Sequence, residues 1–192
     1  MVMACFLIKM VELLFIEGGS NMKIDFLCRE DMATATISNI GKDKNDKYVN
    51  AWAVCTNTFN VDSDPMYIYS DFIKREYPDL NVIEILDIYV PESCRRKGIG
   101  TKLIKSLREN FGKDAIFMVS AGYTNDELPE DPIDEDVNRF KEMLDNFYKK
   151  NKFKPFKPFN ISDNSHGYIF IPNLKKDKLL YYLTEVFETM YS

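Results

Sequence analysis

The feature that most constrains this sequence is a short cationic turn that joins an apolar run to an amphipathic helical pattern. Residues 81–90 form the apolar run, and residues 95–100 form the turn, which reads Arg-Arg-Lys-Gly-Ile-Gly. Apolar residues then recur at the three- and four-residue spacing of one helix face. They are Ile99, Leu103, Ile104, Leu107 and Phe111. The sequence therefore predicts a strand, a turn and a helix in direct succession.

The composition of this turn predicts an anion site. Glycines carry no Cβ, so they let backbone amides come close to a bound group. The first amides of a helix lack intrahelical partners, and the helix dipole adds positive potential there. We therefore expect the turn to hold a phosphate or pyrophosphate. The alternative is a simple turn whose basic side chains are solvated.

The spacing of the glycines separates several anion-binding patterns. The P-loop pattern fails because Gly100 is followed by Thr101 and Lys102, and the dinucleotide pattern fails because position 103 is leucine. The order is instead Arg-x-x-Gly-x-Gly, behind a strand that ends at Val90. This order resembles the coenzyme A loop of the GNAT superfamily of N-acetyltransferases, whose motif is Gln/Arg-x-x-Gly-x-Gly/Ala.

A second segment resembles the same family. Residues 137–150 have the pattern of an amphipathic helix, and residues 147–153 resemble the family signature Phe-Tyr-x-Lys-x-Gly-Phe. Tyr148 matches the family's tyrosine, which lies near the thioester sulfur and protonates the leaving thiolate. Lys152 stands where the family usually has glycine, so we expect a less sharp exit from the helix. The alternative for Tyr148 is an ordinary core or rim tyrosine.

The resemblance covers about residues 22–171 and implies an α+β (α/β GNAT-like) fold. Its central mixed, mostly antiparallel sheet is flanked by helices, and an extra C-terminal helix follows over residues 174–191. The implied activity moves an acetyl group from acetyl-CoA to a primary amine of a small molecule or peptide, by direct attack and without metal. The residues that the resemblance assigns to cofactor binding are Ile88, Tyr89, Val90, Arg95, Arg96, Lys97, Gly98, Ile99, Gly100 and Thr101.

Three residues are candidates for the general base. Glu84 lies inside the apolar strand, eleven residues before Arg95, the offset at which several GNAT enzymes carry their base. A carboxylate in apolar surroundings is also a better proton acceptor. The alternative is a strand residue that pairs with a basic neighbour or reaches solvent. Asp87 is the fallback base. His166 is a further candidate, with an ordinary surface histidine beside a turn as the alternative.

Charge and cysteine content exclude several classes of protein. The chain has 192 residues and a net charge of −5, whereas broad nucleic-acid binding needs a basic face. The four cysteines form no Cys-x-x-Cys pair and there is one histidine, so no zinc pattern exists. We expect reduced thiols in a cytoplasmic protein. Cys94, beside the turn, is either a modification site or a small apolar filler.

The first residues suggest a non-native leader. Residues 1–16 are apolar but contain Lys9 and Glu12, so they are too short for the roughly 20 residues of a membrane span, and they lack a signal-peptide cleavage site. Residues 17–19 read Glu-Gly-Gly, which a ribosome-binding sequence before Met22 would encode. Our hypothesis is a translated leader over residues 1–21 and one acetyltransferase domain over 22–192. The alternative is an extra strand or helix.

The rest of the chain gives further expectations. Strands are predicted at 23–28, 33–40, 48–56 and 115–121, a helix at 66–77, and a closing hairpin from 159–161 and 167–171. Two helices that many GNAT chains place after the first strand have little room here. Residues 123–136 form an acidic loop, which either attracts a cationic amine or is merely solvated. The last helix covers the sheet or binds a second copy.

Two other functions fit parts of this pattern. A non-catalytic sensor or interaction module would bind acyl-CoA without acceptor chemistry. A nucleotide-binding protein would use the same cationic turn, although the failed P-loop spacing counts against it.

Overall fold

The structure, a computed structural model, describes residues 24–29, 31–42, 44–57, 65–122, 134–160 and 165–172, with 179, 181, 183 and 185. The proposed leader at 1–21 and most of the acidic loop lie outside these residues. The chain forms two compact units. Unit 1 contains residues 1–58 and 85–113, and unit 2 contains residues 59–84 and 114–192.

The strands form one seven-stranded mixed sheet with the order β1-β2-β3-β4-β5-β7-β6. Adjacent strands in the described registers run antiparallel, except that β4 and β5 are parallel. This confirms the predicted α+β fold with a mixed, mostly antiparallel sheet. The strands are β1 (Ile24–Arg29), β2 (Met32–Lys42), β3 (Tyr48–Thr56), β4 (Val82–Tyr89), β5 (Ile116–Gly122), β6 (Lys154–Pro155) and β7 (Ser165–Phe170).

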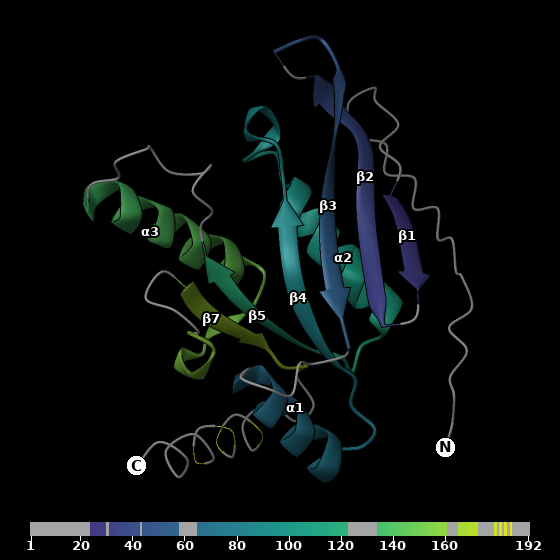
Figure 1. The fold of residues 1–192 in the computed structure, drawn as a ribbon, viewed down its shortest axis with the longest axis vertical. Helices are drawn as coiled ribbons and strands as arrows, with labels where there is room; N and C mark the ends of the chain where they lie inside the picture. Colours follow the sequence, from purple (N-terminus) through teal and green to yellow (C-terminus); the bar gives the residue numbers. More distant parts are fainter. Residues whose placement is uncertain are drawn as a thin grey trace. The chain divides into compact units, whose positions relative to one another are not determined.

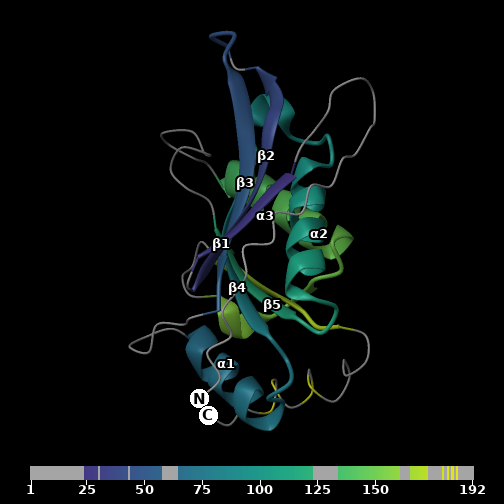
Figure 2. The same ribbon diagram turned by 90° about the vertical axis from the view of Figure 1, so that its right-hand side faces the viewer.

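Unit 1 is a set of strands with helix α2 (Ile99–Phe111) along one face (Figure 1; Figure 2). Small and apolar side chains alternate along β2 and β3 with partly exposed ones, as in a sheet with one covered face. Ala35 and Ala53 pair across the strands and are fully buried. The helix buries Leu103 and Leu107, and Phe111 contacts Phe26 of β1 edge to face at 5.8 Å. The predicted apolar helix face is confirmed.

The start of unit 1 is shorter than in many GNAT proteins, as expected. Arg29 pairs with Met32, so β1 passes into β2 through a tight connection that has no room for helices. The long β2–β3 hairpin follows, as the β-rich segments predicted.

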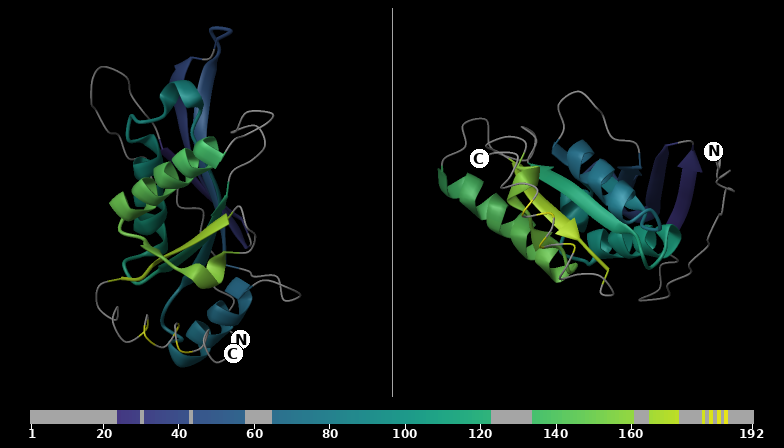
Figure 3. Two further views of the ribbon diagram at one scale, coloured as in Figure 1. Left: turned by 90° about the vertical axis from the view of Figure 1, so that its left-hand side faces the viewer. Right: turned by 90° about the horizontal axis from the view of Figure 1, so that it is seen from below.

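Unit 2 has helices on both faces of its strands. Helix α1 (Pro65–Glu76) and helix α3 (Asp134–Lys150) lie on opposite sides of β5 and β7 (Figure 3). On the α1 side, Tyr69 and Ile73 join a core with Val82, Met118 and Ile169. The sequence placed Ile73, Tyr67, Phe72 and Tyr77 inward, and all four pack in or against this core, whereas Tyr69 was missed.

The predicted closing hairpin is wrong in its first strand. Residues 157–159 form a short 3-10 helix, η3 (Lys157–Phe159), and β6 (Lys154–Pro155) pairs with β7 instead. Phe159 is fully buried, and its ring lies 5.3 Å from that of Tyr69. Packing of this side chain in the core therefore replaces the predicted strand pairing. The backbone of Gly167 in β7 lies close to that of Phe156, since a Cβ at Gly167 would be only 2.3 Å from the Phe156 carbonyl oxygen.

One helix begins earlier than predicted. Helix α3 begins at Asp134 rather than at residue 137. Glu135 and Asp136 therefore lie in its first turn, where the helix dipole stabilises negative charge. In the last predicted helix only four positions are described, and all four are helical. Leu179 and Leu183 among them are fully buried, while Tyr181 is exposed.

Candidate functional site

The predicted turn folds back on the end of β4. A short 3-10 helix, η1 (Glu92–Cys94), follows the strand, and the Arg95 backbone N–H donates to the Glu92 carbonyl at 3.1 Å. The Arg95 side chain donates from Nε to the Val90 carbonyl at 3.0 Å. The first arginine of the motif therefore joins the turn to the strand end.

Gly98 directs the chain into α2. It is the N-cap residue with φ 76° and ψ 6°, a left-handed conformation that glycine adopts without the steric cost of a Cβ. A Cβ built there meets no atom of the described residues within 4 Å, so these residues leave this side of the turn open. Arg96 also has a positive φ, 63°. The side chains of Arg96 and Lys97 are exposed on the same turn.

The backbone amides of the turn are available to a ligand. Among the described residues, none of the hydrogen bonds uses the N–H groups of residues 96–100. The first helical bond of α2 runs from the Lys102 N–H to the Gly98 carbonyl at 3.0 Å. Unengaged amides at a helix N-terminus are the arrangement that binds phosphate groups. Arg96, Lys97 and Gly98 are exposed, whereas Ile99 is buried and Gly100 is half-buried. Lys97 donates from Nζ to the Ser93 carbonyl at 3.0 Å and keeps its charge beside the turn.

Cys94 packs the start of the turn against strand β2. Its side chain is 1% exposed, and Sγ lies 3.8 Å from the Ile40 carbonyl oxygen of β2. A Cβ at Gly41 would lie only 2.9 Å from this sulfur, so the glycine makes room for it. The interpretation of Cys94 as a small apolar filler is confirmed. Gly41 was missed, because its partner is distant in sequence.

Residues 88–90 of the predicted cofactor edge lie at the end of β4. The described ladder between β4 and β5 pairs Val82, Ile83 and Glu84 with residues 116–118 and contains no pair after Glu84. Tyr89 is 39% exposed, and Ile88 and Val90 are half-buried. The backbone of this short segment precedes the turn directly.

A group of side chains lies on the face of unit 1 opposite α2, and sequence reasoning named Asp87 and Tyr89 but missed their partner Trp52. The Trp52 indole donates from Nε1 to Asp87 Oδ2 at 2.9 Å, and the Trp52 and Tyr89 rings stack at 4.2 Å with an interplanar angle of 22°. We call Trp52, Asp87 and Tyr89 the aromatic–acid cluster. One signal was present in the sequence, since Trp52 alternates with the small buried residues Ala51 and Ala53.

The two predicted catalytic residues project from opposite faces of the strands of unit 2. Glu84 is in register with Met118, which belongs to the core on the α1 side. Tyr148 of α3 instead stacks on Tyr168 at 4.5 Å and contacts Phe153, on the other face. The strands of unit 2 therefore separate the Glu84 side chain from the Tyr148 side chain.

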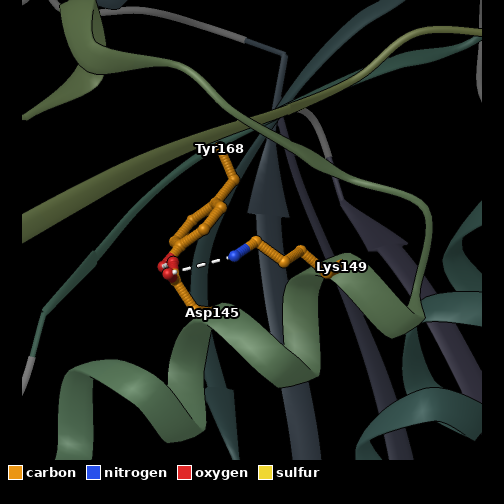
Figure 4. Close-up of polar contacts among 3 residues, drawn as sticks. All are labelled: Asp145, Lys149 and Tyr168. Atoms are coloured by element: carbon orange, nitrogen blue, oxygen red, sulfur yellow. Dashed lines mark hydrogen bonds and ion pairs between the residues drawn. The ribbon is translucent and has the colours of Figure 1, made fainter.

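Tyr148 is held rigidly by aromatic neighbours. It is 4% exposed, and besides Tyr168 and Phe153 it contacts the Phe147 ring at 5.0 Å. The Tyr168 hydroxyl donates to Asp145 Oδ1 at 2.6 Å, and Lys149 Nζ lies 3.3 Å from the other carboxylate oxygen (Figure 4). This hydrogen bond lowers the pKa of Asp145, while burial and the same bond raise that of Tyr168. Tyr168 thus stays protonated, and its hydrogen bond to Asp145 holds the Tyr168 ring in place against Tyr148.

His166, the third base candidate, lies on β7 and pairs with Ala121. It is half-buried, and burial followed by the positive charge of Lys141 lowers its pKa, against an opposite effect of Asp145. Since alternate residues of a strand share a face, His166 lies on the same face as Tyr168 and not on that of Glu84.

The exit from α3 is as sharp as with glycine, which corrects the expectation for Lys152. Lys152 itself adopts φ 64°, its N–H donates to Lys149, and the Phe153 N–H donates to the Tyr148 carbonyl at 3.0 Å. These bonds form the compact helix end that normally uses glycine. The fold forces lysine into the left-handed conformation because Phe153 is buried beyond it.

We predict that Lys152→Gly stabilises the protein. Glycine removes a left-handed strain of about 1 kcal/mol at this position. Chemical denaturation should show a higher free energy of unfolding, whereas the control Lys152→Ala should show no gain. Equal effects of the two substitutions would contradict a strained backbone at residue 152.

Comparison with known proteins agrees with this geometry. Residues 42–126 match the sequence profile of the Acetyltransferase (GNAT) family. The match includes β3, α1, β4, the turn, α2 and β5, and it ends before Tyr148. No curated protein matches the chain significantly.

Two features are absent from the part of the chain that the structure describes. None of its helices combines the length and the apolar character needed to cross a membrane. No group of three or more His, Cys, Asp or Glu side chains gathers there in a way that would hold a metal ion. The family match, the mixed sheet and the turn before α2 lead to one conclusion: residues 42–126 belong to an acetyltransferase domain of the GNAT superfamily, a family that transfers acyl groups from acyl-CoA.

Proposed function

We propose that residues 22–192 act as one N-acetyltransferase domain that moves an acetyl group from acetyl-CoA to a primary amine. The observation that carries this proposal is the exposed turn with unengaged amides at residues 96–100, within the segment that matches the family. Family membership supports acyl transfer in general. The amine acceptor and the roles of single residues are our proposal.

The turn and the strand end would bind the donor. Amides from Arg96 to Thr101 hold the diphosphate, with Arg95 fixing the turn to Val90. Backbone groups of Ile88, Tyr89 and Val90 hydrogen-bond the pantetheine arm, as an added strand would. This positioning makes the later attack nearly unimolecular, which supplies a large part of the attainable rate gain.

The proposed chemistry needs one base and one acid. Glu84 takes a proton from the acceptor ammonium, directly or through water, and the free amine attacks the thioester carbonyl. A C–N bond forms and the C–S bond breaks, with its electron pair going to sulfur. Tyr148 then gives its phenolic proton to the thiolate, so that coenzyme A leaves as the free thiol.

The test is a transfer assay with acetyl-CoA and a panel of primary amines. We expect free thiol to appear only with both substrates, in equal amount to an N-acetylated product identified by mass spectrometry. The same assay on Glu84→Gln and Asp87→Asn shows which of the two carboxylates is the general base. Glu84→Gln should lose turnover with every amine. Tight acetyl-CoA binding without thiol release from any amine would instead favour the non-catalytic sensor.

A further inference from the structure

The aromatic–acid cluster of unit 1 has no role in the function proposed so far. Its three members come from two strands: Trp52 from β3, and Asp87 and Tyr89 from β4. The indole hydrogen bond at 2.9 Å fixes the Asp87 carboxylate, and the stacked Tyr89 ring fixes the indole. The three side chains therefore form one ordered group rather than separate surface residues.

The cluster is accessible. Asp87 is exposed, Tyr89 is 39% exposed and Trp52 is half-buried. Within the described part of the chain, the indole bond through Oδ2 is the one hydrogen bond or ion pair of Asp87, so Oδ1 has no partner among these residues. Around it, the pairs Trp52–Thr36 and Val54–Thr34 continue the same face with uncharged side chains.

This combination of groups favours a cation. A carboxylate attracts positive charge directly, and the faces of tryptophan and tyrosine rings attract it through their quadrupoles. An anion would meet the charge of Asp87, and a neutral apolar group would gain nothing from its open oxygen. The indole donor is already engaged with Asp87, so it is not offered to a ligand.

The bound cation is not the amine that reacts. A carboxylate and the outward face of a stacked ring stabilise the protonated form of an amine and raise its pKa, whereas attack on a thioester requires the neutral form. A group held at this cluster is therefore a second cationic group of the acceptor. Its place is relevant to the reaction because Tyr89 lies in the strand segment that runs directly into the cofactor turn.

We infer that the aromatic–acid cluster binds a non-reacting ammonium group of the acceptor, so that the preferred acceptor is a small di- or polyamine. This inference rests on the proposed function for its link to acetyl transfer. The binding step itself does not depend on catalysis and can be measured alone.

Trp52 is the one tryptophan of the sequence, so its fluorescence reports on this cluster directly. The probes are choline, which cannot be N-acetylated, and its uncharged isostere 3,3-dimethylbutan-1-ol. We expect choline to change the emission saturably and at least about tenfold more tightly than the isostere. Asp87→Asn keeps a hydrogen-bond acceptor for the indole but removes the negative charge, so the affinity for choline should fall about tenfold. The exposed helix variant Asp71→Asn is the matched control and should bind choline normally.

A kinetic arm uses 1,4-diaminobutane and butylamine as acceptors. In Asp87→Asn, kcat/KM for the diamine should fall about tenfold while that for butylamine and the KM for acetyl-CoA stay within about twofold. Equal affinity of choline and its isostere, or no effect of Asp87→Asn on either measurement, overturns the cluster as a cation site. Selective choline binding by a protein that acetylates no amine keeps the cation site and refutes the proposed transferase activity instead.

Discussion

Replacing Tyr148 by phenylalanine is expected to lower kcat by about 100-fold or more and to leave the affinity for acetyl-CoA nearly unchanged. The substitution removes only the hydroxyl proposed to protonate the leaving thiolate. The ring itself is held by Tyr168, Phe147 and Phe153, and phenylalanine keeps these contacts. Steady-state kinetics for kcat and calorimetry for the acetyl-CoA Kd measure the two quantities separately.

Tyr168→Phe is the matched control, because it makes the same chemical change in the ring stacked on Tyr148. It removes the 2.6 Å hydrogen bond to Asp145, so we expect a loss of about 1.5–3 kcal/mol in stability. Turnover by the protein that remains folded should change far less than in Tyr148→Phe. An equal fall of kcat and affinity in Tyr148→Phe would place this residue in binding, and similar kinetics of the two variants would remove its proposed role as an acid.

The local parts of the fold were predictable from the sequence. Each of β4, the turn and α2 shows its own pattern within a few residues, and the structure places α2 at Ile99–Phe111 as the spacing predicted. The left-handed Gly98 is also a local property, since the helix begins there. The resemblance to the GNAT family was inferred from two short motifs. One of them, at residues 95–100, lies within the segment that matches the family profile.

The parts that were missed depend on contacts between residues far apart in the sequence. Trp52 and Asp87 are 35 residues apart, and Cys94 approaches Ile40 across 54 residues. No periodicity reveals such pairs, so neither the aromatic–acid cluster nor the fit of Gly41 to Cys94 could be predicted. The same limit explains the missed 3-10 helix, where burial of Phe159 against Tyr69 outweighs the strand preference of residues 159–161.

Substitution of Gly98 by alanine should weaken acetyl-CoA binding at least about tenfold, or 1.4 kcal/mol. The added Cβ meets no atom of the described part of the chain within 4 Å and therefore projects into the space where the diphosphate would approach the amides. The strain of a left-handed alanine should also reduce stability by about 1 kcal/mol. Binding must therefore be compared with that of a variant that carries at least as much backbone strain elsewhere.

Gly112 supplies this comparison at the opposite end of α2. It has φ 93°, and a Cβ there also meets nothing within 4 Å, so Gly112→Ala adds backbone strain without entering the turn. This variant should lose stability but bind acetyl-CoA as the unmodified protein does.

The most direct test of the account is a calorimetric titration of acetyl-CoA into Gly98→Ala and Gly112→Ala at a temperature where both are folded. We predict a Kd raised at least about tenfold for Gly98→Ala and an unchanged Kd for Gly112→Ala. Full affinity in Gly98→Ala, or an equal loss in both variants, would contradict the claim that the turn before α2 binds the diphosphate of the acyl donor.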